Sequence, residues 1–229
     1  MLNKNLITDL FFDLDHTIYD FDKNATLTFQ AAFSELNITG VQEFMFFFKP
    51  INDAYWEKFV RNEITREHLR FARLKDTFDA INLKVSEEKI RSISEYFVMN
   101  LTRNNYLIEG ALETLNYLLP KYRLHIISNG PKKVQERKIK NTGLTDFFQT
   151  LTVPETAGFQ KPHPEIFRSA MHSAGTKTEQ SIMIGDNLFT DVSGALNAGM
   201  NVIWLNELNK KNEFNTIEIQ KLRELKNIL

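Results

Sequence analysis

The sequence has no cysteine, no long apolar run and almost no excess charge of either sign. The absence of cysteine excludes disulfides, thiol nucleophiles and thiolate metal ligands. With 28 basic and 29 acidic residues, the formal net charge of -1 gives no field that attracts nucleic acid polymers or anionic membranes. No apolar segment is long enough to span a bilayer, and the one near the N-terminus is too short for an export signal. We therefore expect a cytoplasmic monomer or homodimer with neither a membrane nor a nucleic acid polymer as partner.

The composition, 42% hydrophobic and 25% charged over 229 residues, is that of a globular chain with one large domain or two modest ones. Four short apolar runs end in polar residues, as buried strands do where they enter a loop. They are Leu6 to Phe12, Tyr122 to Gly130, Ser181 to Asn187 and Asn201 to Asn206. Helical patterns separate the later runs, and one of them, "KPHPEIFRSAMHSAG", ends at Gly175, a residue type common at helix C-termini. This alternation predicts an α/β fold with a Rossmann-like parallel sheet flanked by helices.

Residues 20–102 differ from the rest because they carry helical patterns and no convincing strand. Ser86 precedes apolar residues at helical spacing, and a serine in that place is a favourable helix N-cap. The aromatic segment "FMFFFKP" is interpreted as a helix end, with Pro50 at the start of the next helix. We therefore expect an all-α cap domain at 20–102, inserted after the first strand of a discontinuous core formed by 1–19 and 103–229. Such an insertion is expected over the carboxyl ends of the strands, where open α/β sheets bind ligands.

The segment "FFDLDHTIYD" places two acids, Asp13 and Asp15, directly after the first expected strand, with Thr17 two residues further on. Residues two apart on a strand point to the same side, although the chain is leaving the sheet here. Aspartate is common in turns, so a solvated turn is one interpretation of this pair. The other interpretation is that the two carboxylates hold something positive.

Two further segments carry candidate anion-binding groups. Ser128, Asn129 and Gly130 form a strand-to-helix turn whose hydroxyl and backbone N–H groups can bind an anion, although such a sequence is also an ordinary turn. Lys161 lies in "FQKPHPEIF", where prolines restrict the neighbouring backbone and open a helix. This lysine is either a solvated surface charge or a cation held towards an anionic group.

The segment "IMIGDNLFTD" carries two more acids. Gly185 permits a tight exit from the strand, Asp186 follows a wholly apolar strand, and Asp191 falls in the first turn of the next helix. The helix macrodipole favours an acid at the position of Asp191 in any case. Because parallel strands bring their carboxyl ends to one edge of the sheet, these acids can converge there with Asp13 and Asp15. Several carboxylates in one crevice repel one another unless a divalent cation joins them, and their oxygen ligands suit Mg²⁺.

The order of these segments resembles that of the haloacid dehalogenase (HAD) superfamily of phosphohydrolases. The four motifs of that family are matched by "DLDHT", "SNG", the lysine of "QKPHPEIF" and "GDNLFTD". The helical insertion resembles the cap domain of the family, so the resemblance covers nearly the whole chain. Within the superfamily, "WEKFVRNEIT", "SNGPKKVQERKIKNTGL", "KPHPEIF" and "GALNAGMNVIWLN" look most like the bacterial pyrimidine 5'-nucleotidases. The resemblance therefore implies a phosphatase whose small-molecule substrate is a nucleoside 5'-monophosphate.

The resemblance also implies roles for individual residues. Asp13 is expected to be the nucleophile that forms an aspartyl-phosphate, and Asp15 is expected to be the general acid and base. The Asp13 carboxylate, the Asp15 backbone carbonyl and Asp186 are expected to hold Mg²⁺. Dehalogenases of the superfamily lack the second acid because they need no proton for the leaving group, so the presence of Asp15 indicates a phosphatase.

The remaining motif residues complete this expected site. Ser128, the Asn129 amide and Lys161 are expected to stabilise the equatorial phosphoryl oxygens. Asp191 and Thr17 are expected behind the metal ligands, where Asp191 orients the waters of the metal or Lys161.

Substrate choice is expected to come from the cap domain. Trp56 either stacks on a base or packs in the cap core, and Arg73 either reaches a substrate oxygen or lies on a solvated helix face. Phosphoglycolate or a sugar phosphate is the alternative substrate class within the superfamily. From another class, a receiver-like domain or a non-catalytic phospho-ligand-binding module remains an alternative. A receiver is shorter, lacks the helical insertion and places its acidic pair and its phosphoacceptor on different strands.

Overall fold

The computed structural model describes residues 3–229. The first two residues of the predicted core segment 1–19 therefore lie outside the described residues. The chain forms two compact units. One unit joins the segment up to Asp20 to Asn105–Leu229, and the other is Phe21–Asn104. The fold is therefore an α/β core that one all-helical insertion interrupts after the first strand.

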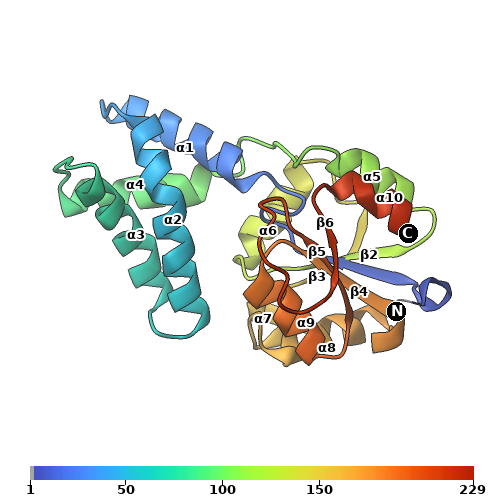
Figure 1. Ribbon diagram of the computed structural model, residues 1–229. Helices are drawn as coiled ribbons and strands as arrows, with labels where there is room; N and C mark the ends of the chain where they lie inside the picture. Colours follow the sequence, from blue (N-terminus) through green and yellow to red (C-terminus); the bar gives the residue numbers. More distant parts are fainter. Residues whose placement is uncertain (1–2) are drawn as a thin grey trace. The chain divides into compact units, whose positions relative to one another are not determined.

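Within residues 3–229, six parallel strands form one sheet at the centre of the α/β unit (Figure 1). The strand order is β3-β2-β1-β4-β5-β6, which confirms the predicted Rossmann-like sheet. The strands are β1 (Asp9–Phe12), β2 (Arg123–Ile127), β3 (Phe148–Thr152), β4 (Ser181–Gly185), β5 (Asn201–Leu205) and β6 (Ile217–Ile219). The chain adds strands to one side of β1 and then to the other, and in open α/β sheets such a reversal marks the ligand-binding edge.

Strand β1 occupies the centre of the sheet, and all four of its residues are buried. Phe12 is in register with Ile126 of β2 on one side and with Ile184 of β4 on the other. The ladder extends one residue beyond the strand, because the Asp13 N–H donates to the Ile184 carbonyl at 2.9 Å. This last bond fixes the point at which the chain leaves the sheet, and with it the position of Asp13.

Helices flank the sheet on both sides, with α5 and α10 on one face and α8 and α9 on the other (Figure 1). The helices of this unit are α5 (Ala111–Leu118), α6 (Lys132–Asn141), α7 (Pro154–Ala157), α8 (Pro164–Ala174), α9 (Gly194–Asn197) and α10 (Leu225–Ile228). Short 3-10 segments lie at Lys4–Leu6, Thr178–Gln180 and Leu222–Glu224, and a π-helical segment at Leu188–Ser193. The apolar face of α8 packs in the core with β1 and β5, and Gly175 ends the helix at φ 62°, as predicted.

Within Phe21–Asn104 the chain forms four helices. They are α1 (Phe21–Glu35), α2 (Val41–Val60), α3 (Arg66–Ala80) and α4 (Glu87–Asn100). Ser86 is the N-cap of α4, as predicted, because its hydroxyl accepts a hydrogen bond from the N–H of Lys89. Thr65 caps α3 in the same way, with its hydroxyl accepting from the N–H of His68. These caps define where two of the helices begin.

The core of the helical unit consists largely of phenylalanine. Its buried phenylalanines are Phe29, Phe33, Phe44, Phe48, Phe78 and Phe97. The Phe29 ring stacks on the Phe97 ring with centroids 4.4 Å apart and an angle of 15° between the planes. Burial of each such side chain contributes roughly 1.5–3 kcal/mol, and favourable ring pairs add to this. The insertion therefore has a hydrophobic core of its own.

The position of Pro50 differs from the sequence prediction. Helix α2 continues through Pro50 instead of ending before it. Proline removes the hydrogen bond to the carbonyl of Phe46, one turn earlier, but both Pro50 and Phe46 are exposed, so water can satisfy that carbonyl. On the inner side, Phe44 and Phe48 anchor the helix to the phenylalanine core.

Strand prediction succeeded in the centre of the sheet and failed at its edges. Strands β1, β2, β4 and β5 fall within the four predicted runs, although the segment Lys4–Leu6 before β1 is 3-10 helical. Strands β3 and β6 were missed, and they are the two outermost strands. Edge strands need no continuous apolar run, because one side faces water; β6 has only three residues, of which only Ile219 is buried.

The two chain segments that connect the units lie side by side within the α/β unit. The Ile108 N–H donates to the Ile18 carbonyl at 2.9 Å, and the Asp20 N–H donates to the Tyr106 carbonyl at 3.1 Å. The chain therefore leaves the α/β unit and returns to it at neighbouring points.

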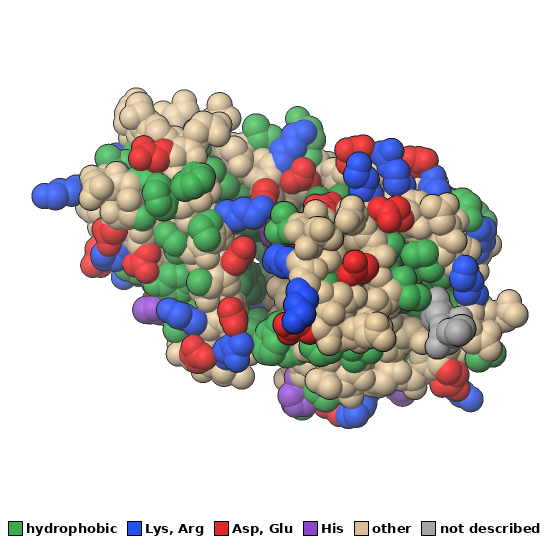
Figure 2. All heavy atoms as spheres, viewed as in Figure 1, with side chains coloured by type: hydrophobic (Ala, Val, Ile, Leu, Met, Phe, Trp, Pro, Cys, Tyr) green, Lys and Arg blue, Asp and Glu red, His purple; other side chains and the backbone are tan. Residues whose placement is uncertain are grey.

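Acidic and basic side chains are interspersed over the face of the molecule seen in Figure 2. This distribution agrees with the nearly balanced charge of the sequence. Among the described residues, no helix combines the length and the apolar character needed to cross a bilayer.

A buried polar network links β1, β2 and β3. The Asp9 carboxylate accepts from Arg123 Nη2 at 2.7 Å and from Thr8 Oγ1 at 2.6 Å, and it lies 2.9 Å from His125 Nε2. The other ring nitrogen of His125 lies 2.9 Å from Thr150 Oγ1. A neutral imidazole with its proton on Nε2 satisfies both contacts, because the hydroxyl can donate to Nδ1. Burial is the larger influence on His125 and lowers its pKa, against the opposing effect of Asp9.

The contribution of His125 to the free energy of unfolding should fall as the pH drops from 7 to 5. The unfolded chain binds a proton at His125 below about pH 6.5, whereas the folded ring with its lowered pKa stays neutral, so protons favour unfolding. Burial tends to raise the pKa of Asp9, but hydrogen bonds from Thr8 and Arg123 outweigh it and lower the pKa, which adds acid sensitivity near pH 4. Denaturant unfolding at several pH values should show that the free energy of unfolding of the wild type, relative to that of His125→Gln, falls as the pH drops from 7 to 5. The matched control is the exposed His172→Gln, which should keep the wild-type slope; an unchanged slope in His125→Gln contradicts this account.

Candidate active site

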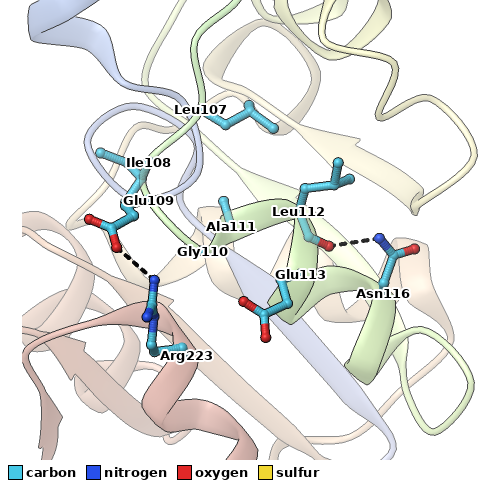
Figure 3. Close-up of a pocket in the computed structure, with 9 residues that line it drawn as sticks. All are labelled: Leu107, Ile108, Glu109, Gly110, Ala111, Leu112, Glu113, Asn116 and Arg223. Carbon is cyan, nitrogen blue, oxygen red and sulfur yellow. Dashed lines mark hydrogen bonds and ion pairs between the residues drawn. The ribbon is translucent and has the colours of Figure 1, made fainter.

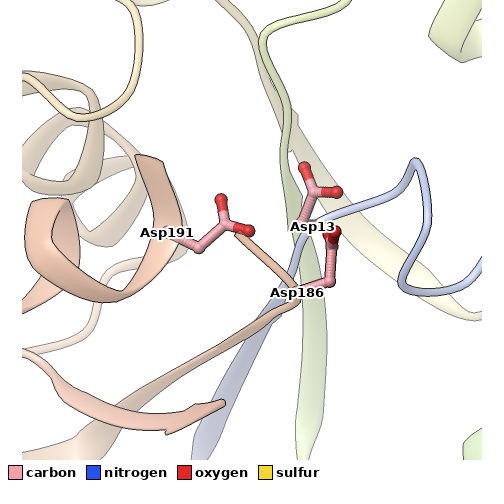
Figure 4. Close-up of side chains that lie close together, drawn as sticks. All are labelled: Asp13, Asp186 and Asp191. Atoms are coloured by element: carbon pink, nitrogen blue, oxygen red, sulfur yellow. The ribbon is translucent and has the colours of Figure 1, made fainter. Parts of the chain in front are cut away.

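Three carboxylates meet beyond the ends of β1 and β4. Asp13 follows β1, Asp186 follows β4, and Asp191 lies in the π-helical segment Leu188–Ser193. Figure 4 shows the three side chains directed towards one another, and one oxygen from each lies within 4.8 Å of the others. Asp13 and Asp191 are buried and Asp186 is half-buried. The predicted convergence of these acids is therefore present in the structure.

Lys161 supplies a positive charge to this group. Its Nζ donates to Asp13 Oδ1 at 2.5 Å and to Asp191 Oδ1 at 2.6 Å. The side chain is only 2% exposed, so Lys161 is not a solvated surface charge. Burial tends to lower the pKa of Lys161, but the carboxylates of Asp13 and Asp191 outweigh it and raise the pKa. The lysine is therefore a permanently charged, buried cation.

The turn after β2 positions Lys161 from the backbone side. Asn129 Nδ2 donates to the Lys161 carbonyl at 2.9 Å, and the Lys161 N–H donates to Asn129 Oδ1 at 2.8 Å. The Ser128 hydroxyl, next to it, is buried and accepts from the Gly130 N–H at 3.1 Å. The side chain of Asn129 thus ties two loops together, a role that the sequence prediction did not give it.

The loop after β4 holds Asp191 in place. The Asn187 N–H donates to Asp191 Oδ2 at 3.1 Å, while Oδ1 of the same carboxylate binds Lys161. A Cβ atom at Gly185 would lie 2.3 Å from Asp191 Oδ2, a distance that excludes any side chain. Gly185 is therefore required by the close approach of the Asp191 carboxylate, in addition to the tight exit that the sequence suggested.

Asp186 is held by two neighbours. Thr17 Oγ1 donates to Asp186 Oδ1 at 3.2 Å, which places the predicted Thr17 behind the acidic group. The Trp204 indole N–H donates to the Asp186 carbonyl at 2.9 Å from β5. The side chain of Asp186 is thus held from the turn after β1, and its backbone from β5.

Asp15 lies apart from the three clustered acids and binds helix α6. Lys138 Nζ donates to Asp15 Oδ1 at 2.5 Å, and Gln135 Nε2 donates to Asp15 Oδ2 at 2.8 Å. Burial tends to raise the pKa of Asp15, but Lys138 and then Gln135 outweigh it and lower the pKa. Gln135 and Lys138 were missed by the sequence analysis. The available signal was their spacing, because both lie on the face of α6 that also buries Val134.

The clustered acids have the opposite electrostatic character. Burial raises the pKa of Asp13 well above its ordinary value; Lys161 opposes this rise, and the carboxylates of Asp191 and Asp186 add to it. Burial and the neighbouring Asp191 raise the pKa of Asp186 to about 8. One ammonium group is therefore insufficient to keep three neighbouring carboxylates ionised at neutral pH.

The two predicted specificity residues lie in the helical unit. Trp56 is half-buried and packs edge-on against Phe59, with ring centroids 5.6 Å apart. Arg73 is only 4% exposed, so the solvated helix face considered for it is wrong. Its Nη1 donates to Asn52 Oδ1 at 2.7 Å, its Nε has no hydrogen-bond partner, and burial lowers its pKa to about 10. The guanidinium is therefore a buried charge with an unused donor.

A separate hollow lies around the start of α5, but none of the predicted site residues lines it (Figure 3). Its lining is Leu107, Ile108, Glu109, Gly110, Ala111, Leu112, Glu113, Asn116 and Arg223. Arg223 pairs with Glu109 at 2.6 Å across it. Glu113 pairs with Lys226 at 2.5 Å, so each charged residue of this lining has an ion-pair partner.

Three relatives match nearly the whole chain. YfnB of Bacillus subtilis, named as a HAD-hydrolase, is 32% identical over 228 residues, which cover 96% of this chain and 94% of YfnB. The pyrimidine 5'-nucleotidase PynA of Streptococcus pneumoniae is 29% identical over 234 residues, covering 96% of each chain. The glyceraldehyde 3-phosphate phosphatase of Methanothermobacter thermautotrophicus is 29% identical over 237 residues, covering 98% of this chain and 100% of that protein.

The similarity extends to a solved structure and to a family. The crystal structure of YfnB bound to magnesium matches with a TM-score of 0.87 and 29% identity, covering 97% of this chain and 98% of that chain. The haloacid dehalogenase-like hydrolases as a family match residues 10–205. That span contains both strand ends with their acids, the buried lysine and the helical insertion. The resemblance noted in the sequence is thus confirmed, and the chain belongs to the haloacid dehalogenase-like hydrolase family.

Proposed function

We propose that this protein is a Mg²⁺-dependent phosphomonoester hydrolase that acts through an aspartyl-phosphate on Asp13. The observation that carries the proposal is the buried Lys161 ammonium, bonded to both Asp13 and Asp191 at the ends of β1 and β4. A carboxylate nucleophile beside a fixed cation suits attack on an anionic phosphoryl group. Membership of a hydrolase family and the intact acidic residues favour catalysis over a receiver-like or silent binding module.

In the first half of the reaction, an Asp13 carboxylate oxygen attacks phosphorus in line with the ester oxygen. The new P–O bond gives the aspartyl-phosphate, and the ester P–O bond breaks. The leaving oxygen takes a proton from the neutral form of Asp15, which follows Asp13 by two residues. Lys138 and Gln135 lower the pKa of Asp15, so the neutral form is the minor one in the free protein. An alkoxide needs such a proton whereas a halide does not, so the presence of Asp15 supports phosphate ester hydrolysis over dehalogenation.

In the second half, water attacks the phosphorus of the aspartyl-phosphate. Asp15 takes the proton that this water loses, the bond between phosphorus and the Asp13 oxygen breaks, and inorganic phosphate leaves. Both enzyme groups then have their starting protonation. Lys161 and the hydroxyl of Ser128, on the neighbouring turn, would stabilise the equatorial oxygens in both transition states.

The acidic cluster fits a divalent cation. The oxygens of Asp13, Asp186 and Asp191 lie within 4.8 Å of one another, and the raised pKa values of Asp13 and Asp186 indicate a shortage of positive charge. Asp13, Asp186 and the backbone carbonyl of Asp15 would hold Mg²⁺, with Asp191 and Thr17 behind them. When bound, the ion would neutralise charge between nucleophile and phosphate.

For the substrate, we propose a nucleoside 5'-monophosphate. Two points support this class: the full-length similarity to PynA and the resemblance of several sequence segments to the pyrimidine 5'-nucleotidases. Trp56 and Arg73 are the candidate specificity residues of the helical unit. Trp56 would stack on the nucleobase, and Arg73 would donate a hydrogen bond to a substrate oxygen. A sugar phosphate is the second candidate, supported by the equal identity to glyceraldehyde 3-phosphate phosphatase.

Asp13→Asn should reduce kcat on p-nitrophenyl phosphate with Mg²⁺ by at least about a thousandfold, because the amide is a poor nucleophile. Asp15→Asn should reduce kcat on nucleoside monophosphates by about 10²–10⁴-fold, and less on the activated nitrophenyl ester. The control is the exposed Asp146→Asn, which should keep wild-type rates. Near wild-type turnover in Asp13→Asn would falsify the aspartyl-phosphate mechanism.

Chelation with EDTA should abolish activity and added Mg²⁺ should restore it, because the clustered acids need a compensating charge. In Asp186→Asn, the Mg²⁺ concentration for half-maximal activity should rise by about tenfold or more. Binding should also appear in Tm, with a smaller Mg²⁺-induced rise for the variant than for the wild type. Full activity in EDTA, or identical Mg²⁺ titrations of the two proteins, rules out the metal site.

Comparison of kcat/KM over a panel of phosphate esters tests the substrate class. Nucleoside 5'-monophosphates should exceed sugar phosphates by more than tenfold, or about 1.4 kcal/mol of transition-state stabilisation. Trp56→Leu should narrow this gap while leaving p-nitrophenyl phosphate hydrolysis unchanged, because that ester has no nucleobase. A tenfold preference for sugar phosphates would retire the nucleotidase assignment and keep the phosphatase.

A further inference from the structure

Two side chains of α6 bind the two oxygens of a single carboxylate, that of Asp15. Lys138 Nζ donates to Oδ1 at 2.5 Å and Gln135 Nε2 donates to Oδ2 at 2.8 Å. The two residues are three apart on α6, so they lie on one face of the helix. Because each oxygen has its own donor, the carboxylate can neither rotate nor tilt without losing a hydrogen bond. We call Gln135 and Lys138 the Asp15 clamp.

The clamp is buried on the side away from solvent. Gln135 is fully buried and the Lys138 side chain is 3% exposed, whereas the Asp15 side chain is 24% exposed. The carboxylate therefore keeps one accessible edge while both donors lie behind it. Two carboxylate oxygens offer about four lone-pair positions, so the clamp leaves acceptor capacity on that edge. A carboxylate held in this way remains available to a reacting group.

The neighbouring residues are shaped around the clamp. A Cβ atom at Gly130 would lie 1.9 Å from Gln135 Nε2, so only glycine leaves room for the amide. Gln135 Nε2 also donates to the Ser128 hydroxyl at 2.7 Å, and Gln135 Oε1 has no hydrogen-bond partner. Lys138 Nζ lies 4.9 Å from the ring centroid of Tyr19, which is buried. One amide nitrogen thus links the Asp15 carboxylate to the proposed phosphate-binding serine.

A plain ion pair that stabilises the fold is the simplest alternative. Such a pair does not require both oxygens of one carboxylate to be bound by two different side chains of one helix. A purely structural ion pair also does not require Gln135 Nε2 to donate to both Asp15 and Ser128. These features are explained if the position of the Asp15 carboxylate, relative to the phosphate-binding turn, is what matters.

We infer that Gln135 and Lys138 are positioning residues that fix the Asp15 carboxylate for proton transfer to the leaving oxygen and from the attacking water. They touch neither substrate nor metal in this role and act through Asp15. The inference rests on the proposed phosphatase function. It adds Gln135 and Lys138 to the residues proposed to assist the reaction. It also explains why residue 130 of the "SNG" turn is glycine, because a side chain there would clash with the Gln135 amide.

The test compares two esters on one enzyme preparation, with Mg²⁺ present. The ratio of kcat/KM for phenyl phosphate to that for p-nitrophenyl phosphate measures the need for leaving-group protonation, because phenolate is the poorer leaving group. The ratio does not depend on the fraction of folded enzyme, so a partly unfolded variant still gives an answer. In Lys138→Met and Gln135→Met the ratio should fall by about tenfold or more, as in Asp15→Asn.

Two further variants separate positioning from general damage. Lys138→Arg restores a cation on Asp15 and should recover the wild-type ratio to within about threefold. Added to Asp15→Asn, Lys138→Met should lower the ratio by no more than about twofold, since residues that act through one group are not additive. The exposed Lys140→Met on the same helix should leave the ratio unchanged.

A wild-type ratio in both Lys138→Met and Gln135→Met, or faster phenyl phosphate hydrolysis in either, overturns the clamp. Additive losses in the Asp15→Asn background overturn it as well. These outcomes are distinct from failure of the proposed function, which would appear as activity that survives Asp13→Asn.

Discussion

The buried ammonium of Lys161 is the charge on which the rest of this site depends. Removing an ammonium group from water costs several kcal/mol unless carboxylates and hydrogen bonds compensate for it. Here the compensation comes from Asp13 after β1 and Asp191 beyond β4, while Asn129 after β2 holds the lysine backbone. Four segments that are distant in sequence must therefore be in place together. The central position of β1, between β2 and β4, is what makes this possible.

Two aspartates separated by one leucine acquire opposite properties from this arrangement. Asp13 faces other acids in a buried place, and its pKa is raised; Asp15 faces Lys138 and Gln135, and its pKa is lowered. The lowered pKa of Asp15 suits the base that takes the proton of the attacking water, and a cation beside Asp13 would counter the raised pKa of the nucleophile. The turn after β1 gives the two carboxylates different surroundings although only one residue separates them, because it directs one side chain towards β4 and the other towards α6.

The sequence predicted those features that depend on burial and order along the chain. Asp13 and Asp186 were found because each follows a short apolar run, and such runs become the central strands. The edge strands β3 and β6 were missed because a strand with one open side needs few apolar residues.

Side-chain direction was harder to predict than position. Helix α6 carries five basic residues, Lys132, Lys133, Arg137, Lys138 and Lys140, and composition does not tell which of them turns inward. Lys138 does so because it shares a helix face with Gln135 and Val134. Arg73 shows the same effect in α3, where it lies one turn from the buried Leu69. Pro50 was misjudged because water can satisfy the exposed Phe46 carbonyl that it leaves unpaired, while Phe44 and Phe48 hold the helix on its inner side.

The backbone hydrogen bond between Ile108 and Ile18 has a consequence for the helical insertion between them. The chain departs and comes back at hydrogen-bonded neighbouring points, and the entropy cost of closing an inserted segment grows only slowly with its length. We infer that the insertion is a replaceable module. Exchange or enlargement of these helices would leave the acids and the lysine where the sheet puts them.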